Sequence, residues 1–247
     1  MSGVTGCVLI VMGPQRWRFR HNMFVSAAGI LYARATMRSR FVGRTCALAL
    51  LLVLSSATPS ATCAGTWVAV ATDAPVVNAG VAILLSDGAV LVLGNASPNR
   101  ELGDTWHRLT PDSTGSYVNG TWSAIAPMLD TREYFSSQVL MDGRLYVAGG
   151  EYGTGKSKAE VYDPVMDTWT ATPPPGGVVS DANSEMLPDG RVLQALVEGN
   201  LKKTRIYDPV TNTFVDGPQC LGIHNESVWM KLADDSILFV DRGTTAS

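Results

Sequence analysis

Short hydrophobic runs rich in β-forming residues, each closed by a polar turn signal, fill the chain from residue 65 onwards. Residues 134–140 are rich in β-forming residues and lead into Asp142-Gly143, a pair typical of a hairpin turn, and residues 144–148 predict the returning strand. Residues 159–162 predict a third strand, which Asp163-Pro164 ends, and residues 168–171 predict a fourth. Because no stretch of this body keeps a helical period, we expect an all-β fold of four-stranded antiparallel units.

The same plan recurs along the chain at a constant spacing. An aromatic residue precedes an acidic turn residue by 20 positions in four successive units, at Trp67, Trp122, Trp169 and Phe214. The distance from one aromatic to the next drifts through 55, 47 and 45 residues, so the remaining part of each unit varies in length. Four short strands in a unit of about 45–50 residues are typical of a β-propeller blade.

Three short motifs narrow the class of propeller: a glycine pair after the second strand, a tyrosine on the third and a tryptophan on the fourth, at Gly149-Gly150, Tyr162 and Trp169. This pattern resembles the kelch family, and the next unit departs from it with Glu198-Gly199 and Phe214. The sequence Tyr-Phe-Ser-Ser at 134–137 is similar to that of the secreted galactose-oxidase-type propellers. The resemblance implies a partial kelch-type β-propeller over residues 65–247, with about three complete four-stranded blades and parts of a fourth.

Charge divides the chain into a basic leader and an acidic body. Residues 1–64 hold seven of the 19 Lys and Arg and no Asp or Glu, so residues 65–247 carry a net charge of −10. Three arginines, the apolar residues 46–54 and then small residues predict a signal peptide over 37–64, preceded by a mis-assigned extension over 1–36. We therefore expect a secreted or periplasmic protein with no membrane anchor after cleavage. The acidic body disfavours a nucleic-acid partner.

The constant spacing also selects candidate binding residues. Ten residues before each acidic turn residue stand Val77, Arg132, Val179 and His224, and eight before it stand Ala79, Tyr134, Asp181 and Glu226. These positions begin the innermost strands, so we expect Arg132, Tyr134, Asp181, His224 and Glu226 to line the mouth of the channel; the alternative is that they are solvated strand ends. Glu151 and Tyr152 join them from the variable loop after a second strand, where binding often sits. Tyr152 and Tyr117 are candidates for stacking on a sugar.

Residues 150–157 satisfy the P-loop pattern GxxxxGK[ST]. A P-loop needs a helix directly after it, whose amides bind phosphate, whereas residues 159–164 predict a strand ended by Pro164. We therefore expect no nucleotide partner.

The resemblance to galactose oxidases raises, as the alternative function, a copper-radical oxidase of the galactose or glyoxal oxidase type or a degenerate relative that lacks the Tyr-Cys cofactor. In that family a tyrosine at the position of Tyr134 binds copper and is thioether-linked to a cysteine one blade earlier, which corresponds to a position near Asn78. No cysteine lies between Cys63 and Cys220, and the body has only two histidines, His107 and His224. We therefore expect a binding module for a carbohydrate or protein ligand, without catalytic residues or a cofactor; copper enters only under the alternative.

Overall fold

A computed structural model describes residues 8–11, 66–77, 79–94, 102–198 and 202–240. The predicted signal peptide lies outside these residues. The chain divides into two compact units, of which the first, residues 1–7 and 16–66, is described only at Thr66. The second unit, Val8–Gln15 and Trp67–Ser247, holds all the other described residues.

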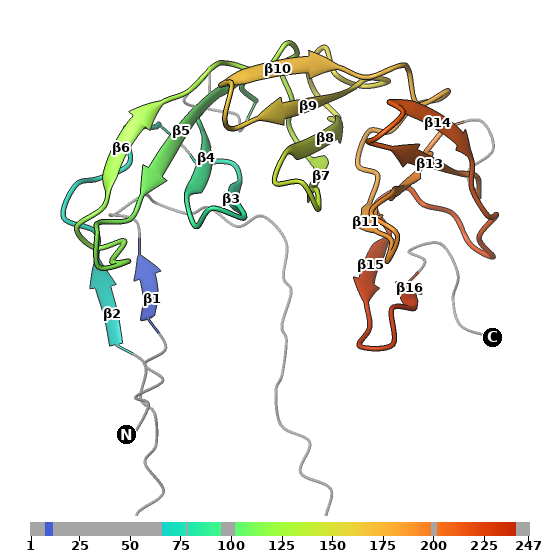
Figure 1. The fold of residues 1–247 in the computed structure, drawn as a ribbon. Helices are drawn as coiled ribbons and strands as arrows, with labels where there is room; N and C mark the ends of the chain where they lie inside the picture. Colours follow the sequence, from blue (N-terminus) through green and yellow to red (C-terminus); the bar gives the residue numbers. More distant parts are fainter. Residues whose placement is uncertain (1–7, 12–65, 78, 95–101, 199–201, 241–247) are drawn as a thin grey trace, which may run out of the picture. The chain divides into compact units, whose positions relative to one another are not determined.

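The described residues form strands and no helix, and most of the strands pair into three four-stranded antiparallel sheets (Figure 1). The first sheet contains β3 Ala82–Leu84, β4 Val90–Gly94, β5 Thr105–Thr110 and β6 Thr121–Ala124. The second contains β7 Phe135–Val139, β8 Leu145–Gly149, β9 Ala159–Asp163 and β10 Thr168–Ala171. The third contains β11 Ser184–Met186, β12 Val192–Ala195, β13 Thr204–Asp208 and β14 Thr213–Asp216. The predicted all-β fold with three complete blades is confirmed.

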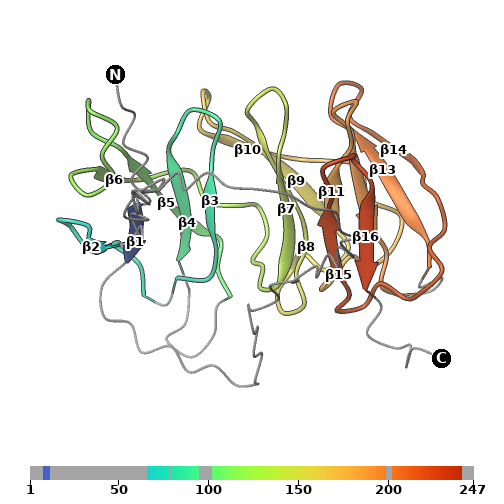
Figure 2. The same ribbon diagram turned by 90° about the horizontal axis from the view of Figure 1, so that it is seen from below.

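Two further pairs of strands flank these blades. The hairpin of β15 Val228–Lys231 and β16 Ile237–Val240 supplies the predicted part of a fourth blade. At the other end, β2 Thr66–Ala69 pairs with β1 Val8–Val11, a strand that lies within the predicted extension over residues 1–36. Figure 2 shows the inner strands β3, β7, β11 and β15 side on; β11 contacts both β7 and β15.

Each inner hairpin turns in the same way. The turn aspartates Asp87, Asp142, Asp189 and Asp234 each accept a bond at 3.0–3.1 Å from the backbone N–H two residues later. The next residue is left-handed in all four turns, with a φ of 84–88° at the three glycines and 66° at Asp235. Glycine adopts this region without the steric cost that other residues meet. An aspartate followed by a left-handed residue, which is glycine in three of the four turns, therefore sets the geometry of the turn between the two innermost strands.

The repeated aromatic occupies the outermost strand, as predicted, and reaches back toward the preceding blade. Trp122 Nε1–H donates to the carbonyl of Thr72 at 3.0 Å, and Trp169 Nε1–H donates to that of Ala126 at 2.9 Å. The Ala126 N–H in turn donates to Asp167, 2.9 Å away. These bonds tie the outer edge of a blade to the crossover that enters it, which explains why the aromatic and the inner turn keep a constant separation.

The core lies between successive blades. The side chains of β8 alternate between two buried clusters: Leu145 and Val147 pack toward the first blade, Tyr146 and Ala148 toward the third. Both faces of β8 are therefore buried, as expected for a sheet covered on both sides. Gln194 adds a buried polar link, since its Oε1 accepts from Ser136 at 3.0 Å and from Tyr146 at 3.2 Å.

The glycine pair of the second blade has a packing role. A Cβ on Gly149 would lie 1.8 Å from the carbonyl oxygen of Val179, on the crossover into the next blade. In the third blade the matching backbone position is Leu196, because its N–H bonds to the carbonyl of Lys203 as Gly149 bonds to Lys158. The prediction that Glu198-Gly199 takes the place of the glycine pair was therefore wrong: the matching position lies two residues earlier in the sequence.

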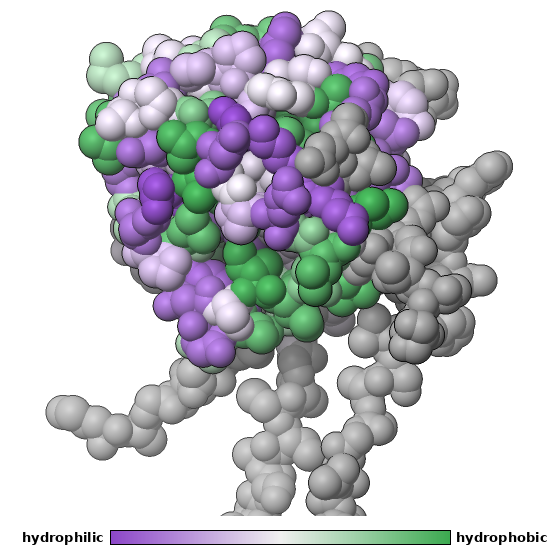
Figure 3. All heavy atoms as spheres, turned by 90° about the vertical axis from the view of Figure 1, so that its right-hand side faces the viewer, coloured by the Kyte–Doolittle hydropathy of each residue, from purple (hydrophilic) through white to green (hydrophobic). Residues whose placement is uncertain are grey.

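The β15–β16 hairpin buries one face and exposes the other. Trp229 faces the core, whereas Val228, Met230, Leu238 and Val240 are each about half exposed. Figure 3 shows hydrophobic side chains gathered over this hairpin, below a more polar region.

Candidate ligand-binding cavity at the ends of the inner strands

A cavity of about 410 Å³ opens where three successive blades begin their inner strands. Its lining comes mainly from the starts of β7, β11 and β15, with one residue from the loop after β8: Tyr134, Phe135, Glu151, Asp181, Ala182, Asn183, Glu226 and Ser227. Tyr134, Asp181 and Glu226 hold the same repeat position, and the structure brings them together here. That they bind a ligand stays a prediction.

These three residues share an unusual backbone conformation. Tyr134, Asp181 and Glu226 have φ values of 53°, 49° and 53°, in the left-handed region that L-residues rarely occupy. In each case the chain turns sharply at this residue before the inner strand starts. Strained residues of this kind gather at ligand sites, where the surrounding structure holds them in place.

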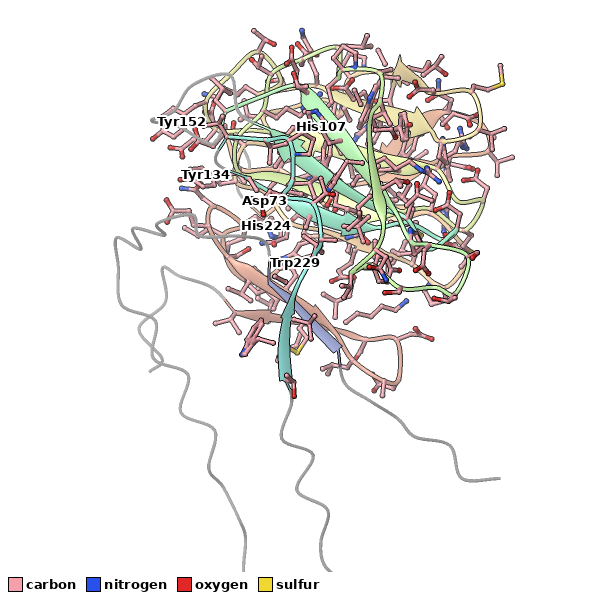
Figure 4. The ribbon with its side chains drawn as sticks, turned by 90° about the vertical axis from the view of Figure 1, so that its left-hand side faces the viewer. Asp73, His107, Tyr134, Tyr152, His224 and Trp229 are labelled. Carbon is pink, nitrogen blue, oxygen red and sulfur yellow. The ribbon has the colours of Figure 1, made fainter. Side chains whose placement is uncertain are left out.

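The loop after β8 supplies the other predicted residues. The Glu151 N–H donates to the carbonyl of Glu133 at 2.8 Å, which fixes the loop beside the start of β7. The rings of Tyr134 and Tyr152 meet edge to face with their centroids 6.3 Å apart. Both rings are partly exposed, at 54% and 42%, and Figure 4 shows them on the same side of the molecule. The loop and the crossover thus meet at the cavity, as the spacing predicted.

The cavity is acidic. Glu151, Asp181 and Glu226 are three of its eight lining residues, and none of the described residues that line it is basic. Burial, followed by the negative charges of Glu151 and Glu133, raises the pKa of Asp181 to about 6. Burial, together with the repulsion from the two neighbouring carboxylates, therefore brings the pKa of the Asp181 carboxyl close to neutral.

Arg132 does not line the cavity, so this part of the prediction was wrong. Its side chain is fully buried and binds Glu160, with Nε and Nη2 at 3.0 and 2.8 Å from one carboxylate oxygen. Its Nη1 donates to the carbonyls of Gly149, Gly155 and Lys158 at 2.5–3.2 Å. Arg132 therefore holds the crossover onto the loop between β8 and β9.

His224 is also a core residue rather than a channel residue. It is fully buried, and its ring lies 5.2 Å from that of Trp229 and 5.4 Å from that of Phe239. Tyr117, a sequence candidate for stacking, donates its hydroxyl to the carbonyl of Gly88 at 2.7 Å and so supports the first inner turn. Tyr152 stays the stacking candidate; it does not line the cavity, but its ring contacts that of Tyr134, which does.

Four residues that line the cavity were not predicted from the sequence: Phe135, Ala182, Asn183 and Ser227. Three of them stand seven residues before the turn aspartate, so the same spacing could have found them. Asn183 lies one residue further on and donates from Nδ2 to the carbonyl of Ser227 at 2.6 Å, which links β11 to β15 at the cavity floor.

The P-loop-like segment 150–157 is a tightly packed connection between β8 and β9. A Cβ on Gly153 would lie 2.2 Å from the carbonyl oxygen of Thr131, and one on Gly155 would lie 2.4 Å from Arg132. Strand β9 follows at Ala159, as the sequence predicted, in place of a phosphate-binding helix. Close approach of the crossover therefore accounts for these glycines.

The donor set does not fit the copper of a radical oxidase. Among the described residues, no group of three or more His, Cys, Asp and Glu side chains is placed to hold a metal ion. Tyr134 lies beside carboxylates at the cavity, and Figure 4 shows His107 well apart from His224. The described residues that line the cavity with Tyr134 include no histidine or cysteine, so the imidazole and thiol that this chemistry needs are not among them and we derive no step through copper.

Within the described part of the chain, no helix has the length and apolar character needed to cross a membrane.

Comparisons with known proteins converge on one repeat type. A family model for the kelch motif matches residues 138–176. An F-box/kelch-repeat protein of Arabidopsis thaliana is 30% identical over 167 residues, which cover 58% of this chain and 34% of that protein. The spermatocyte protein spe-26 of Caenorhabditis elegans is 27% identical over 138 residues, covering 52% of this chain and 23% of that protein. The chain thus spans about a quarter to a third of these relatives.

Solved structures were also compared. YjhT matches with a TM-score of 0.46 and 15% identity, covering 57% of this chain and 50% of that one. A fungal alcohol oxidase in complex with copper matches with a TM-score of 0.29 and 15% identity, covering 64% of this chain and 57% of that one. From the motif match, the kelch-repeat relatives and the three four-stranded sheets, the chain carries kelch-type repeats folded as blades of the β-propeller kind.

Proposed function

We propose that this protein is a non-catalytic recognition module that binds a protein or carbohydrate ligand through the cavity at the ends of its inner strands. The observation that carries the proposal is the convergence of one repeat position from three blades, Tyr134, Asp181 and Glu226, on one open cavity. A pocket with an aromatic wall and a few convergent polar groups is the usual form of a ligand site. Variable loops on a rigid scaffold are also where recognition commonly evolves.

The same proposal includes export, so that recognition takes place outside the cytoplasm, and the predicted signal peptide over 37–64 supports it. N-terminal sequencing of the protein recovered from the culture medium or periplasm tests this part. A mature chain that begins near residue 62 or 65 supports export, and an uncleaved chain in the cytoplasm contradicts it.

The binding proposal is tested with a glycan array and a random peptide display library, each probed with the full chain and with Tyr134→Ala. Val210→Ala serves as the control, because Val210 is 91% exposed on the turn between β13 and β14. Ligands that bind the parent and the control but not Tyr134→Ala support the proposal. Binding that is indifferent to Tyr134, or copper-dependent release of peroxide by the full chain, overturns it.

A further inference from the structure

The connection between β5 and β6 is longer than its counterparts in the other two blades. It covers residues 111–120, whereas the matching turns of the second and third blades cover residues 164–167 and 209–212. Where this connection enters β6, residues 119–121 (Asn-Gly-Thr) match Asn-x-Ser/Thr, the acceptor pattern for N-linked glycosylation. The longer loop of the first blade therefore carries a modification signal that the matching turns lack.

The structure holds Asn119 in a tight turn at the surface. The Gly120 N–H donates to the carbonyl of Tyr117 at 3.1 Å, which closes a four-residue turn with Asn119 in its third position. Asn119 is exposed, and so is Thr121, the first residue of β6. A sugar on the Asn119 amide therefore extends into solvent and displaces no part of the core.

The carboxylate of Asp112 organises the same loop. It accepts from the Thr114 and Ser116 N–H groups, both at 2.9 Å. Hydrogen bonds from the Thr114 hydroxyl, from these two N–H groups and from the Asn119 amide lower the pKa of Asp112. Because Nδ2 of Asn119 carries two hydrogens and glycosylation replaces one of them, a donor for Asp112 remains.

Tyr117 adds a fixed aromatic ring to this turn, two residues before Asn119. Its hydroxyl donates to the carbonyl of Gly88 at 2.7 Å, and the residue is half-buried. A tyrosine ring combines an apolar body with a polar tip, which suits it to packing on a sugar. The turn thus combines an acceptor amide with an aromatic surface for the first sugar.

The turn lies at the end of the strands opposite to the cavity. The contact of Tyr117 with Gly88 places it beside the β3–β4 turn, whereas the cavity opens where the inner strands begin. Asn119 also stands next to β6, the outermost strand of its sheet, which pairs only with β5 among the described strands (Figure 1). An exposed edge strand is a template for pairing with another chain, and a bulky hydrated group beside it blocks that approach.

Two other segments match the acceptor pattern. Residues 225–227 (Asn-Glu-Ser) enter the cavity: Glu226 lines it, and Ser227 is 7% exposed and accepts from Nδ2 of Asn183 at 3.3 Å. A glycan there stands at the mouth of the cavity and obstructs the proposed ligand. The match at residues 95–97 is followed by a proline and lies outside the described residues. The turn at Asn119 is therefore the acceptor that the described structure favours.

We propose that Asn119 is a site of N-linked glycosylation in the exported protein, and that its glycan covers the outer edge of the first blade. This inference rests on the export that the proposed function includes, and adds a modification site to it. A host transferase supplies the glycan from a lipid-diphosphate-linked oligosaccharide. The bond from the anomeric carbon to the diphosphate oxygen breaks, and the lipid diphosphate leaves with the bonding electrons. The anomeric carbon forms its new bond to Nδ2 of Asn119, which gives up one proton, and no group is oxidised or reduced.

The experiment expresses the full chain in insect cells, once with its own N-terminal residues and once behind an established signal peptide. Protein from the medium is digested with a peptide-N-glycosidase in heavy-oxygen water, which converts a glycosylated asparagine into a labelled aspartate, and its peptides are mapped by mass spectrometry. We expect the label at Asn119, together with a drop in the mass of the intact protein on digestion. An unlabelled Asn119 in protein from the medium overturns the inference.

Paired variants assign the drop in mass to this turn. Asn119→Gln and Thr121→Ala each destroy the acceptor pattern and should lose the drop, whereas Thr121→Ser preserves the pattern and should keep it. Asn225→Gln is the matched control, because it removes the match at the cavity and should leave the drop unchanged. A drop that persists undiminished in Asn119→Gln, or that Asn225→Gln removes, contradicts the site.

The outcome is separable from that of the proposed function. If the chain's own N-terminal residues fail to export it, export is contradicted, and the version with the established signal peptide tests Asn119 by itself. If the exported chain carries no glycan, export and recognition stand and this inference falls. Because the glycan lies away from the cavity, Asn119→Gln should bind the same library ligands as the parent with unchanged affinity, and a loss of binding contradicts this placement.

Discussion

Removing one partner of the buried ion pair of Arg132 and Glu160 should lower stability strongly. Both side chains are at most 1% exposed, so Arg132→Met leaves the Glu160 carboxylate buried without its counter-charge. Breaking a buried pair in this way costs about 3–5 kcal/mol. Three carbonyls also lose a donor, and they belong to the loop that carries Glu151 toward the cavity. We therefore expect a loss of at least about 3 kcal/mol.

Urea unfolding followed by tryptophan fluorescence measures this loss. With an m-value of about 2 kcal/mol/M, a loss of 3 kcal/mol lowers the midpoint by about 1.5 M. Adding Glu160→Gln to Arg132→Met removes the uncompensated charge and should recover part of the stability, giving a clear coupling energy. Arg191→Met is the control, since its pair with Asp189 is 40–50% exposed and water screens the attraction between the two charges.

A different result would refute the structural role. If Arg132→Met unfolds at the same urea concentration as Arg191→Met, the guanidinium is not a buried anchor. If the substitution instead removes ligand binding without lowering stability, Arg132 acts at the channel mouth, as its place in the repeat first suggested.

Three further predictions test the packing between blades and the charge of the cavity. Gly149→Ala should lose more than about 3 kcal/mol in urea unfolding, because its Cβ would overlap the Val179 carbonyl and its φ of 85° disfavours L-residues. Trp169→Phe should cost about 1–2 kcal/mol in the same assay, since it removes the indole N–H bond to Ala126. Asp181→Asn should raise the urea midpoint at pH 7.5, and the gain should shrink as the pH falls below 6, because protonation of Asp181 in the unaltered protein removes the cost of burying its charge and the repulsion from its neighbours.

Each of these has a contrary outcome. Unchanged stability of Gly149→Ala would show that the crossover does not pass against the glycine. A loss for Trp169→Phe that equals the loss for Trp169→Leu would assign the effect to ring volume rather than to the hydrogen bond. If the difference in urea midpoint between Asp181→Asn and the unaltered protein stays constant between pH 4 and pH 8, the pKa of Asp181 is not raised by folding.

Repetition made the blades predictable from the sequence. A turn aspartate bonds to the N–H two residues later in all four inner hairpins, and this local interaction needs no distant partner. The aromatic likewise falls on the outermost strand wherever a blade is complete. Period-2 alternation between such fixed turns leaves little freedom in register.

The cavity residues were predictable only in part, because strand alternation fails where the inner strand begins. Positions ten and eight before the turn aspartate should share a face in an extended chain. The left-handed residue at the second of these positions turns the chain, so Arg132 enters the core while Tyr134 reaches the cavity. Arginine and histidine side chains are polar, so the sequence alone suggested a binding role for Arg132 and His224. Only their buried contacts in the folded protein show that both support the core.

The sequence by itself determined the all-β class, the four-stranded unit, the turns and the position at which each inner strand begins, since these follow from local spacing and turn chemistry. Tertiary structure alone decided which of those residues face the cavity. It set the partners of Arg132 and His224, packed the glycines of the loop after β8 against a crossover and gathered carboxylates from separate blades. The reason is physical: burial, charge repulsion and close approach arise between segments that are distant in the chain, and no local pattern encodes them.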